Sequence, residues 1–338
     1  MCAVMAATPP ERVRPESDAP IFSVDGDGEP RYRGMPLGRV VGMPFDQLWG
    51  HLVGSARGLP PAEPYNLPVR TGDTRVDVIS ALAQLAPAWS YRPLSEISPS
   101  LARDNLARAS AMTLSFVAQS GRGEHVPAVP QREVDLASTV TERFLVRWRG
   151  SADPAAVRAL DAFWLAVAEN GHSPSTRTAR LAAEVGSDVA SCLAAAVAVA
   201  GSPFLGGAVA RGLAVVEEAE RTGRARAVVE AYVDRYGALP GFGEGLPADL
   251  RARVLREACV SAGARHLEAA DAVVAAADEL LAERGVSRDE RAPNTMFWGA
   301  VLLDQLGVAP QLMCALYVCG RTAGWSAHVL EVQATLRG

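Results

Sequence analysis

The sequence predicts an all-α fold with a small β-hairpin near its start. Apolar residues recur at helical spacing through most of the chain, and the segments that carry this spacing are bounded by capping residues, Gly and Pro. The stretch FSVDGDGEPRYRG, residues 22–34, instead alternates around a DGDG turn, which is typical of a hairpin. A chain of 338 residues is long for one hydrophobic core, so it forms either two domains or one elaborated helical domain.

The charge and composition of the chain exclude some binding partners and some kinds of catalysis. The net charge is −5 and the Arg residues are dispersed among Asp and Glu, which argues against a nucleic-acid partner. We expect a small-molecule or protein partner. The chain contains no Lys, so a Schiff-base lysine and a phosphate-binding P-loop lysine are both excluded.

Cysteines and targeting segments suggest a cytoplasmic protein. The five Cys form no CxxC pair and no metal-ligand spacing, so we expect no metal site and a reducing compartment. Residues 1–20 lack the apolar run of a signal peptide and are expected to form a disordered leader. The most apolar segment, CLAAAVAVAGSPFLGGAVA, is broken by Gly201 and Pro203, which predicts a core helix and a turn rather than a membrane span.

Helix boundaries can be predicted at several points. A helix from residue 74 should close before Pro87, and the next, from residue 100, should end on Gly at 123. Asp153 is the expected cap of a helix that stops at Asn170 and Gly171.

Three further helices are expected. One starts at Ser173 and runs unbroken to residue 201, one is capped by Asn294, and the last begins after Gly320. His172, in the junction before Ser173, is either a group that serves the carbonyls of the preceding helix end or a catalyst. The Gly-rich segment 237–245 is either a backbone that approaches a ligand closely or a flexible connector.

Several of these stretches, in this order, resemble the citrate synthase family from about residue 21 onward. GHSPSTRTAR is similar to the family's GLNASTFTAR, GSPFLGGAV to GPLHGGAN, and PGFGEG to PGFGH. NTMFWGAVLLDQLGVAPQLM and GRTAGWSAHVLE are similar to the NVDFYSGVVLYALGIPPELF and GRVAGWVAHILE segments.

The resemblance implies a citrate synthase-like, two-domain homodimer whose cleft closes on an acyl-CoA and a keto acid. Residues 21–173 and 301–338 would form the large domain, and residues 174–300 the small domain. Closure would exclude water around a reactive enolate. Coenzyme A thioester is thus the expected co-substrate, with no tightly bound cofactor.

The resemblance also implies a changed active site. Asn170 and Glu244 stand where the family has catalytic histidines, and Met296 stands where it has the aspartate that removes a proton. An amide can still donate a hydrogen bond, whereas a thioether offers no base. Leu205 replaces another family histidine, so the cleft is also less polar.

Other family features remain. Arg321 matches the arginine that binds a substrate carboxylate, and Arg251 matches the DPR arginine in a loop about two residues shorter. The alternative for each is a structural ion pair. The turn of Pro240, Gly241, Phe242 and Gly243 matches the family's CoA-adenine contact, although such a turn can persist for packing alone.

Two functions follow from this comparison. The first is a repurposed enzyme of specialised metabolism that makes or breaks a carbon–carbon bond on an acyl-CoA or related carboxylate, using Glu244 with help from His172. The second is a non-catalytic pseudoenzyme that binds a ligand or regulates a paralogue. Under either one, standard citrate synthase activity should be lost or greatly reduced.

Overall fold

The computed structural model describes residues 19–26, 28–171, 173–202, 205–243 and 250–336. The predicted leader therefore lies almost wholly outside the described residues. His172 and Glu244, the two ionisable candidates of the sequence analysis, also lie outside them.

The hairpin near the start is confirmed, and a third strand extends it. Strands β1 (Phe22–Val24), β2 (Pro30–Tyr32) and β3 (Met35–Pro36) pair antiparallel in the order β1-β2-β3. Tyr32 lies opposite Phe22, and its buried hydroxyl donates to the carbonyl oxygen of Leu165 at 3.0 Å. The sheet is thereby fixed to a core helix far along the chain.

The rest of the described chain is mainly helical, as predicted. The helices are α1 (Leu37–Val40), α2 (Phe45–Leu52), α3 (Thr74–Ala88), the 3-10 turn η1 (Leu94–Glu96), α4 (Pro99–Arg122), α5 (Gln131–Asp135), α6 (Val140–Arg149), α7 (Pro154–Val167), α8 (Pro174–Glu184), α9 (Val189–Ala200), α10 (Gly207–Thr222), α11 (Ala225–Tyr236), α12 (Leu250–Ser261), α13 (Leu267–Glu283), α14 (Thr295–Gln305) and α15 (Pro310–Thr335).

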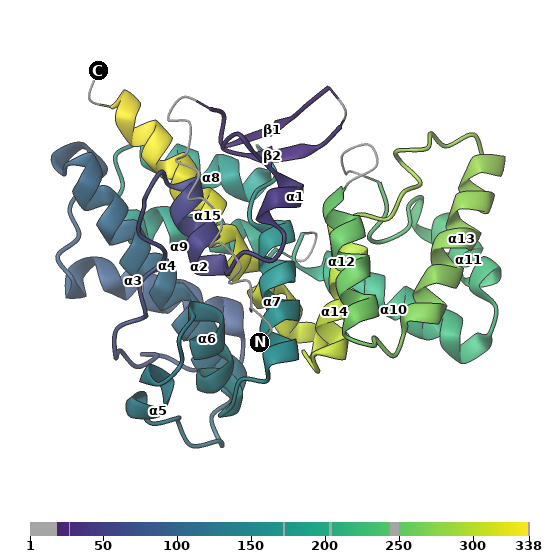
Figure 1. Cartoon of the computed structure of the whole chain (residues 1–338), viewed down its shortest axis with the longest axis horizontal. Helices are drawn as coiled ribbons and strands as arrows, with labels where there is room; N and C mark the ends of the chain where they lie inside the picture. Colours follow the sequence, from purple (N-terminus) through teal and green to yellow (C-terminus); the bar gives the residue numbers. More distant parts are fainter. Residues whose placement is uncertain (1–18, 27, 172, 203–204, 244–249, 337–338) are drawn as a thin grey trace, which may run out of the picture.

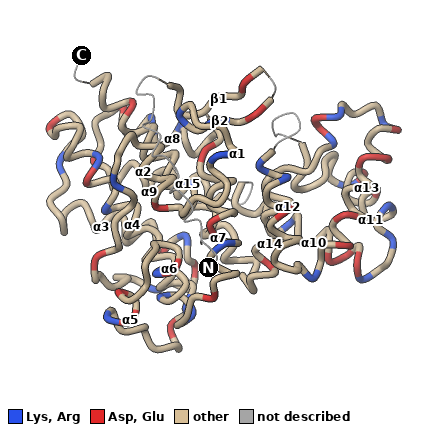
Figure 2. Tube along the Cα trace, in the orientation of Figure 1, with Lys and Arg blue, Asp and Glu red and all other residues tan. Residues whose placement is uncertain are grey.

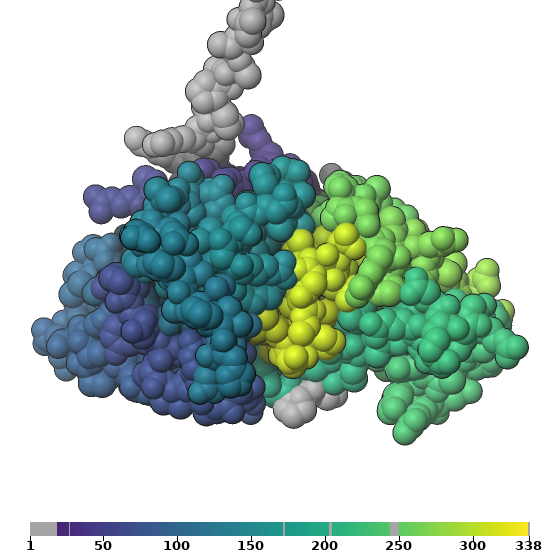
Figure 3. All heavy atoms as spheres, turned by 90° about the horizontal axis from the view of Figure 1, so that it is seen from below, coloured from purple at the N-terminus to yellow at the C-terminus, as the bar shows by residue number. Residues whose placement is uncertain are grey.

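The helices form two lobes around the long helix α15. Helix α15 packs against α2, α4, α7, α8 and α9 in one lobe, and α10 to α14 form the second lobe (Figure 1). Seen from below, the C-terminal segment lies between the two lobes (Figure 3). Helices α8 and α9, which the predicted division placed in the small domain, pack against α15 and α3. The domain boundaries themselves stay a prediction.

Three predicted helix starts are confirmed by their caps. The side chain of Asp153 accepts from Ala156 N at 3.1 Å, and Ser173 Oγ accepts from Thr176 N at 3.4 Å. Asn294 Oδ1 accepts from Met296 N at 2.8 Å. These bonds satisfy backbone donors that have no partner inside the helix.

Two predicted boundaries were wrong because local signals were misjudged. Helix α3 continues through Pro87 to Ala88, since a proline in the last turn interrupts little of the remaining hydrogen-bond ladder. The helix expected to run from Ser173 to residue 201 is two helices. Gly186 adopts a left-handed φ of +80° at the break, and Asp188 caps α9.

The last helix was also predicted wrongly. Helix α15 begins at Pro310, and Gly320, taken as a boundary, lies in its interior. A Cβ at Gly320 would lie 2.6 Å from Val167 Cγ2 and 3.0 Å from Trp164 O. The glycine therefore lets α7 and α15 approach closely, so here it serves packing rather than a helix end.

Apolar segments and thiols are mostly buried in the described chain. No single described helix has the length and hydropathy to cross a bilayer, and the pair α14 and α15, which passes the test jointly, is bent by 116°. Cys192, Cys259 and Cys319 are buried free thiols, and Cys314 is half-buried. Burial raises the pKa of Cys192 and Cys259 to about 12 and that of Cys314 to about 11.

Candidate active site

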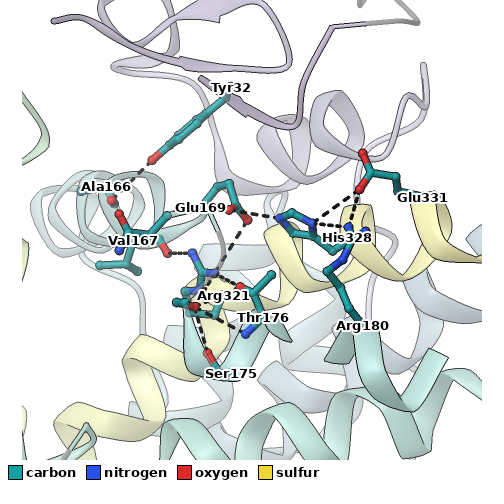
Figure 4. Close-up of polar contacts among 12 residues, drawn as sticks. Tyr32, Ala166, Val167, Glu169, Ser175, Thr176, Arg180, Arg321, His328 and Glu331 are labelled. Atoms are coloured by element: carbon teal, nitrogen blue, oxygen red, sulfur yellow. Dashed lines mark hydrogen bonds and ion pairs between the residues drawn. The ribbon is translucent and has the colours of Figure 1, made fainter. Parts of the chain in front are cut away.

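The candidate site lies where the end of α7, the start of α8, α12 and α15 meet. Its centre is Glu169, a fully buried carboxylate two residues after the end of α7. Glu169 Oε1 lies 3.2 Å from His328 Nε2, and Glu169 Oε2 lies 3.7 Å from Arg321 Nη2 (Figure 4). Because His328 and Arg321 both come from α15, one carboxylate joins this helix to the α7–α8 junction.

Arg321 is completely enclosed by protein. Its guanidinium donates to Thr176 Oγ1 at 2.6 Å and to Val167 O at 3.2 Å, and Ser173 Oγ lies 3.4 Å away. Its role as a ligand of substrate carboxylate stays a prediction. In the described conformation its hydrogen bonds and its ion pair are internal.

The local charge balance keeps Glu169 ionised. Burial alone raises the pKa of this carboxyl, but the Arg321 charge and the hydrogen bond from His328 outweigh it, so the pKa lies below its ordinary value. A buried ion pair of this kind is retained only where its partners are well placed. Glu169 Oε2 is nevertheless without a hydrogen bond in the described part of the chain.

A glycine makes room for the buried carboxylate. A Cβ on Gly324 would lie 2.0 Å from Glu169 Oε2 and 2.5 Å from Ala168 O. The Gly324 amide also donates to Ala168 O at 3.2 Å, although Gly324 lies within α15. The contact between α15 and the end of α7 therefore requires a residue without a side chain here.

The outer end of this network reaches the surface. His328 Nδ1 lies 3.1 Å from Arg180 Nη1, and Arg180 also pairs with Glu331 (Figure 4). From the interior to the surface, the network therefore runs from the Glu169 carboxylate through the His328 imidazole to Arg180 and Glu331. This arrangement links α8 to the last turns of α15.

Arg251 and Asn170 are brought together across the two lobes. Arg251, on α12, is buried and donates to Asn170 Oδ1 at 2.9 Å and to Glu169 O at 2.8 Å. Its guanidinium carbon also lies 5.4 Å from the centre of the Phe22 ring. Two positions that the resemblance assigned to the active site are therefore in direct contact, and Asn170 itself is exposed.

The predicted CoA turn is fixed to the cap of α14. Phe242 bridges to Pro293, Asn294 N donates to Gly241 O at 2.8 Å, and Asn294 Nδ2 donates to Gly243 O at 2.9 Å. A Cβ on Gly241 would lie 2.8 Å from Phe297 Cβ, so packing also requires glycine there. The turn of residues 240–243 is thereby held beside Met296, whose side chain is partly exposed.

Leu205 lies apart from these contacts. Its amide donates to Ser202 Oγ at 3.4 Å in the turn between α9 and α10. The next residue, Gly206, packs against Cys314 of α15. A cavity of about 570 Å³ lies beside this turn, lined by residues that include Arg75, Ser202 and Cys314, and its described lining contains none of the predicted site residues that the structure describes.

A second polar cluster lies in the other lobe. Ligand atoms of Glu217, His266 and Asp304 lie within 4.8 Å of one another, a spacing that a metal ion would accept. Arg265 already pairs with both carboxylate oxygens of Asp304, at 2.6 and 2.8 Å. Arg265 thus already places one positive charge beside Asp304 in this cluster.

Sequence reasoning missed the centre of the site. Glu169 and His328 were not selected, although Glu169 is adjacent to Asn170 and His328 stands in the GWSAHVLE segment two turns after Arg321. The sequence offered one signal. Arg321 and His328 are seven residues apart and so share a face of α15, which is otherwise strongly apolar.

Fold and site together define a two-lobed helical protein with a buried carboxylate–guanidinium–imidazole network beside the contact between the lobes. The family model described as "Citrate synthase, C-terminal domain" matches residues 65–337. The chain belongs to the citrate synthase family, and the resemblance found in its sequence is confirmed.

Two relatives agree with this assignment. "Putative citrate synthase 2" of Mycobacterium tuberculosis is 48% identical over 320 residues, covering 92% of this chain and 85% of the relative. "2-methylcitrate synthase" of Shewanella oneidensis is 27% identical over 182 residues, covering 53% of this chain and 48% of the relative.

The structural comparison shows the fold. Citrate synthase from Thermoplasma acidophilum, solved with carboxymethyl coenzyme A and oxaloacetate, has a TM-score of 0.74 at 19% identity, covering 92% of this chain and 88% of its own. The Pyrobaculum aerophilum enzyme has a TM-score of 0.74 at 20% identity, covering 94% and 86%.

Proposed function

We propose that this chain is an enzyme of specialised metabolism that makes or breaks a carbon–carbon bond on an acyl-CoA or related carboxylate. It works without standard citrate synthase activity. The family assignment supports the reaction class, and the Thermoplasma relative binds a CoA compound together with an oxo acid. The turn of residues 240–243 is the proposed contact for CoA, which is a co-substrate rather than a resident cofactor.

The contact of Arg251 with Asn170 carries this proposal. It joins α12 to the loop after α7, so a guanidinium from one lobe lies against the α7–α8 junction of the other. A substrate carboxylate would take the place of Asn170 Oδ1 on this guanidinium, whose planar fork can hold both carboxylate oxygens. Arg321 pairs with Glu169, whose backbone carbonyl accepts from Arg251, so it would help to hold this junction in place.

The chemistry would differ from that of the family. Met296 has no basic atom, so proton transfer falls to another group. Glu244 and His172 are the proposed acid–base pair, and both lie outside the described residues. Asn170 would contribute a hydrogen bond without titrating.

Ligand binding tests the proposal first. The purified protein is heated with acetyl-CoA, propionyl-CoA, oxaloacetate and other oxo acids, because a ligand of the folded state raises the melting temperature by mass action. CoA release is then followed over pairs of these compounds. No thermal shift with any thioester at millimolar concentration would contradict the use of CoA.

The proposed acid–base residue has its own test. For any pair that is turned over, Glu244→Gln should reduce kcat/KM at least about a hundredfold, since it removes the titrating group. Glu257→Gln, an exposed carboxylate on α12, is the matched control and should retain activity. An unchanged rate in Glu244→Gln would remove this residue from the mechanism.

A non-catalytic function is the second candidate. Met296 and Leu205 replace ionisable positions with apolar side chains, and the Nη atoms of Arg321 donate to internal partners, Val167 O and Thr176 Oγ1. A pseudoenzyme that binds a ligand or regulates a paralogue would keep binding without turnover. Thermal shifts with CoA esters and no CoA release on any pair would favour it.

We also propose that the protein is a homodimer in the cytoplasm. Leu181 and Val185, near the end of α8, are 60% and 74% exposed, and they adjoin the strongly apolar helix α9. Exposed apolar residues beside such a helix favour a covered interface. Sedimentation of Leu181→Glu and of wild type tests this. If the variant still has the mass of two chains, Leu181 does not lie in the dimer interface. Free thiols are compatible with a reducing compartment.

A further inference from the structure

The cavity of about 570 Å³ beside the α9–α10 turn is lined by both lobes. Helix α10 of the second lobe contributes to its lining, together with α3, α4, α9 and α15 of the first (Figure 1). We call it the interlobe cavity. Its volume lies within the range of ordinary small-molecule sites, and a compound bound there would contact both lobes at once.

The lining combines an apolar part with a polar part. Four of its side chains are valines that are each at most 3% exposed: Val78, Val117, Val197 and Val318. Their methyl groups face open volume, so they lack packing partners that an apolar ligand would supply. Arg75 and Gln311, which also line the cavity, are exposed. The lining therefore suits a compound with an apolar body and a charged head.

A glycine fixes the position of the arginine. A Cβ on Gly201 would lie 2.3 Å from Arg75 Cδ and 2.7 Å from Arg75 Cγ, so the aliphatic stem of Arg75 lies directly on the backbone of the turn after α9. A long side chain whose stem is already packed loses less conformational freedom when its head binds a ligand. The guanidinium is thereby held beside the cavity.

Asp73, the one carboxylate in the described lining, serves as a helix cap. Its Oδ1 accepts from Arg75 N at 2.9 Å and from Val76 N at 3.3 Å. Its Oδ2 lies 3.7 Å from Arg75 Nη2, and the two side chains are 43% and 54% exposed. An exposed pair of this kind contributes little. Since a guanidinium has five N–H donors, Arg75 can hold a ligand carboxylate beside this contact.

Other groups around the cavity also favour an anion. The first residues of α10 and α15, Gly207 and Pro310, line it, and neither helix start has a side-chain cap among the described residues. The amides at a helix start carry a partial positive charge. A Cβ on Gly207 would lie 2.5 Å from Arg211 Nη1, so a second guanidinium lies against the lining.

We propose that the interlobe cavity binds a small organic carboxylate, with its carboxylate on Arg75 and its apolar body against the buried valines. This site is separate from the contacts proposed for Arg251 and for the turn of residues 240–243. The inference therefore does not rest on the proposed function, and neither outcome of its test alters that function.

Calorimetric titration of the full-length protein with butyrate, pentanoate and hexanoate tests the inference. Affinity should rise about fourfold with each added methylene, the scale of burying one CH₂ group. Hexan-1-ol has the body without the charge, and inorganic phosphate has a charge without the body. Both should bind at least about tenfold more weakly than hexanoate. Equal binding of either probe, or no binding of hexanoate at millimolar concentration, would overturn the proposal.

Two variants test the two parts of the site. Arg75→Gln should weaken hexanoate binding at least about tenfold, because it removes the charged partner of the carboxylate. Ala210→Leu places a larger side chain in the lining and should remove most of the gain with chain length. Arg92→Gln is the matched control, since Arg92 is an exposed arginine that pairs with Glu96 away from the cavity.

Melting temperatures of the three variants check that each one folds. Unchanged hexanoate affinity in Arg75→Gln would overturn the role of the arginine, and an unchanged chain-length series in Ala210→Leu would place the apolar body elsewhere. An equal loss of affinity in Arg92→Gln would also overturn the proposal, because the effect would then come from the overall charge of the protein.

Discussion

Two ion pairs, one from each lobe, differ in how deeply they are buried. In the lobe around α15, Glu169 and Arg321 are both fully buried. Along α11 and α13 of the other lobe, pairs such as Arg284 with Asp234 are solvent-exposed, and both signs of charge alternate along the chain (Figure 2). The same residue types thus serve different purposes in the two places.

The two pairs differ in how much stability is lost when one partner is removed. An exposed pair contributes little, because water solvates each partner nearly as well when the other is removed. A buried pair costs desolvation to form, so its retention beside Asn170 suggests positioning rather than stability alone. Removing one partner there leaves an uncompensated charge in the interior.

The largest effect is expected from breaking the buried pair. Glu169→Ala should lower the free energy of unfolding by about 3–5 kcal/mol, because Arg321 would remain buried without its anion. Urea unfolding measures this. Glu331→Ala, at the exposed end of the same network, is the control and should cost about 1 kcal/mol or less. A cost below about 1 kcal/mol for Glu169→Ala would show that Arg321 is solvated after all.

Crowding the same carboxylate should cost somewhat less. Gly324→Ala would place its Cβ 2.0 Å from Glu169 Oε2 and 2.5 Å from a backbone oxygen, and should destabilise by about 3 kcal/mol. Gly212→Ala in α10, whose nearest neighbours lie 3.8 and 3.9 Å away, should instead be neutral or stabilising. Equal stability of the two variants would contradict the close contact of α15 with the end of α7.

A carboxylate without a cation should respond to pH in the opposite sense to Glu169. Burial raises the pKa of Asp161 to about 6, although Thr141 and Phe45 N donate to it. Its protonated form is favoured in the folded protein, so its contribution is full below the unfolded pKa of 3.8 and is lost as the pH rises through about 6.

Asp161→Asn removes this titration. Relative to wild type, the variant should gain about 2 kcal/mol of unfolding free energy between pH 4 and pH 7. Unfolding in urea at both pH values measures the difference. A constant difference across this range would mean that Asp161 ionises normally in the folded state.

The smallest effect is expected at the surface of the other lobe. Arg284 pairs with Asp234 at 2.7 Å and with Glu230 at 3.6 Å. Arg284→Ala should cost at most about 1 kcal/mol, and 0.5 M salt should remove most of it. A cost that salt leaves unchanged would indicate lost packing of the Arg stem instead.

The sequence predicts the helices well where their ends carry capping chemistry. Asp153, Ser173 and Asn294 each bond the backbone as expected, because a cap is a local interaction. Gly186 and Gly320 were misjudged, because one glycine provides a left-handed turn and the other a close helix contact. Only the tertiary structure distinguishes these two uses.

The site was less accessible to sequence reasoning. The resemblance selected Asn170 and Arg251, and the fold places them in contact. Glu169 was missed because a charged residue in a short junction is usually exposed, and its burial depends on Gly324 some 155 residues later. Long-range packing of this kind leaves no periodic pattern.

The buried thiols give the chain an internal reporter of local opening. Cys259 lies on α12 in one lobe, while Cys192 and Cys319 lie on α9 and α15 in the other. A thiolate must form and be reached before a labelling reagent reacts, and burial opposes both. The labelling rate of each cysteine, read by mass spectrometry of peptides, would therefore follow how often its own helix is exposed. A ligand that closes the two lobes should lower the labelling rates of these cysteines by different factors. The cysteine whose rate falls most would identify the helix that closure protects most.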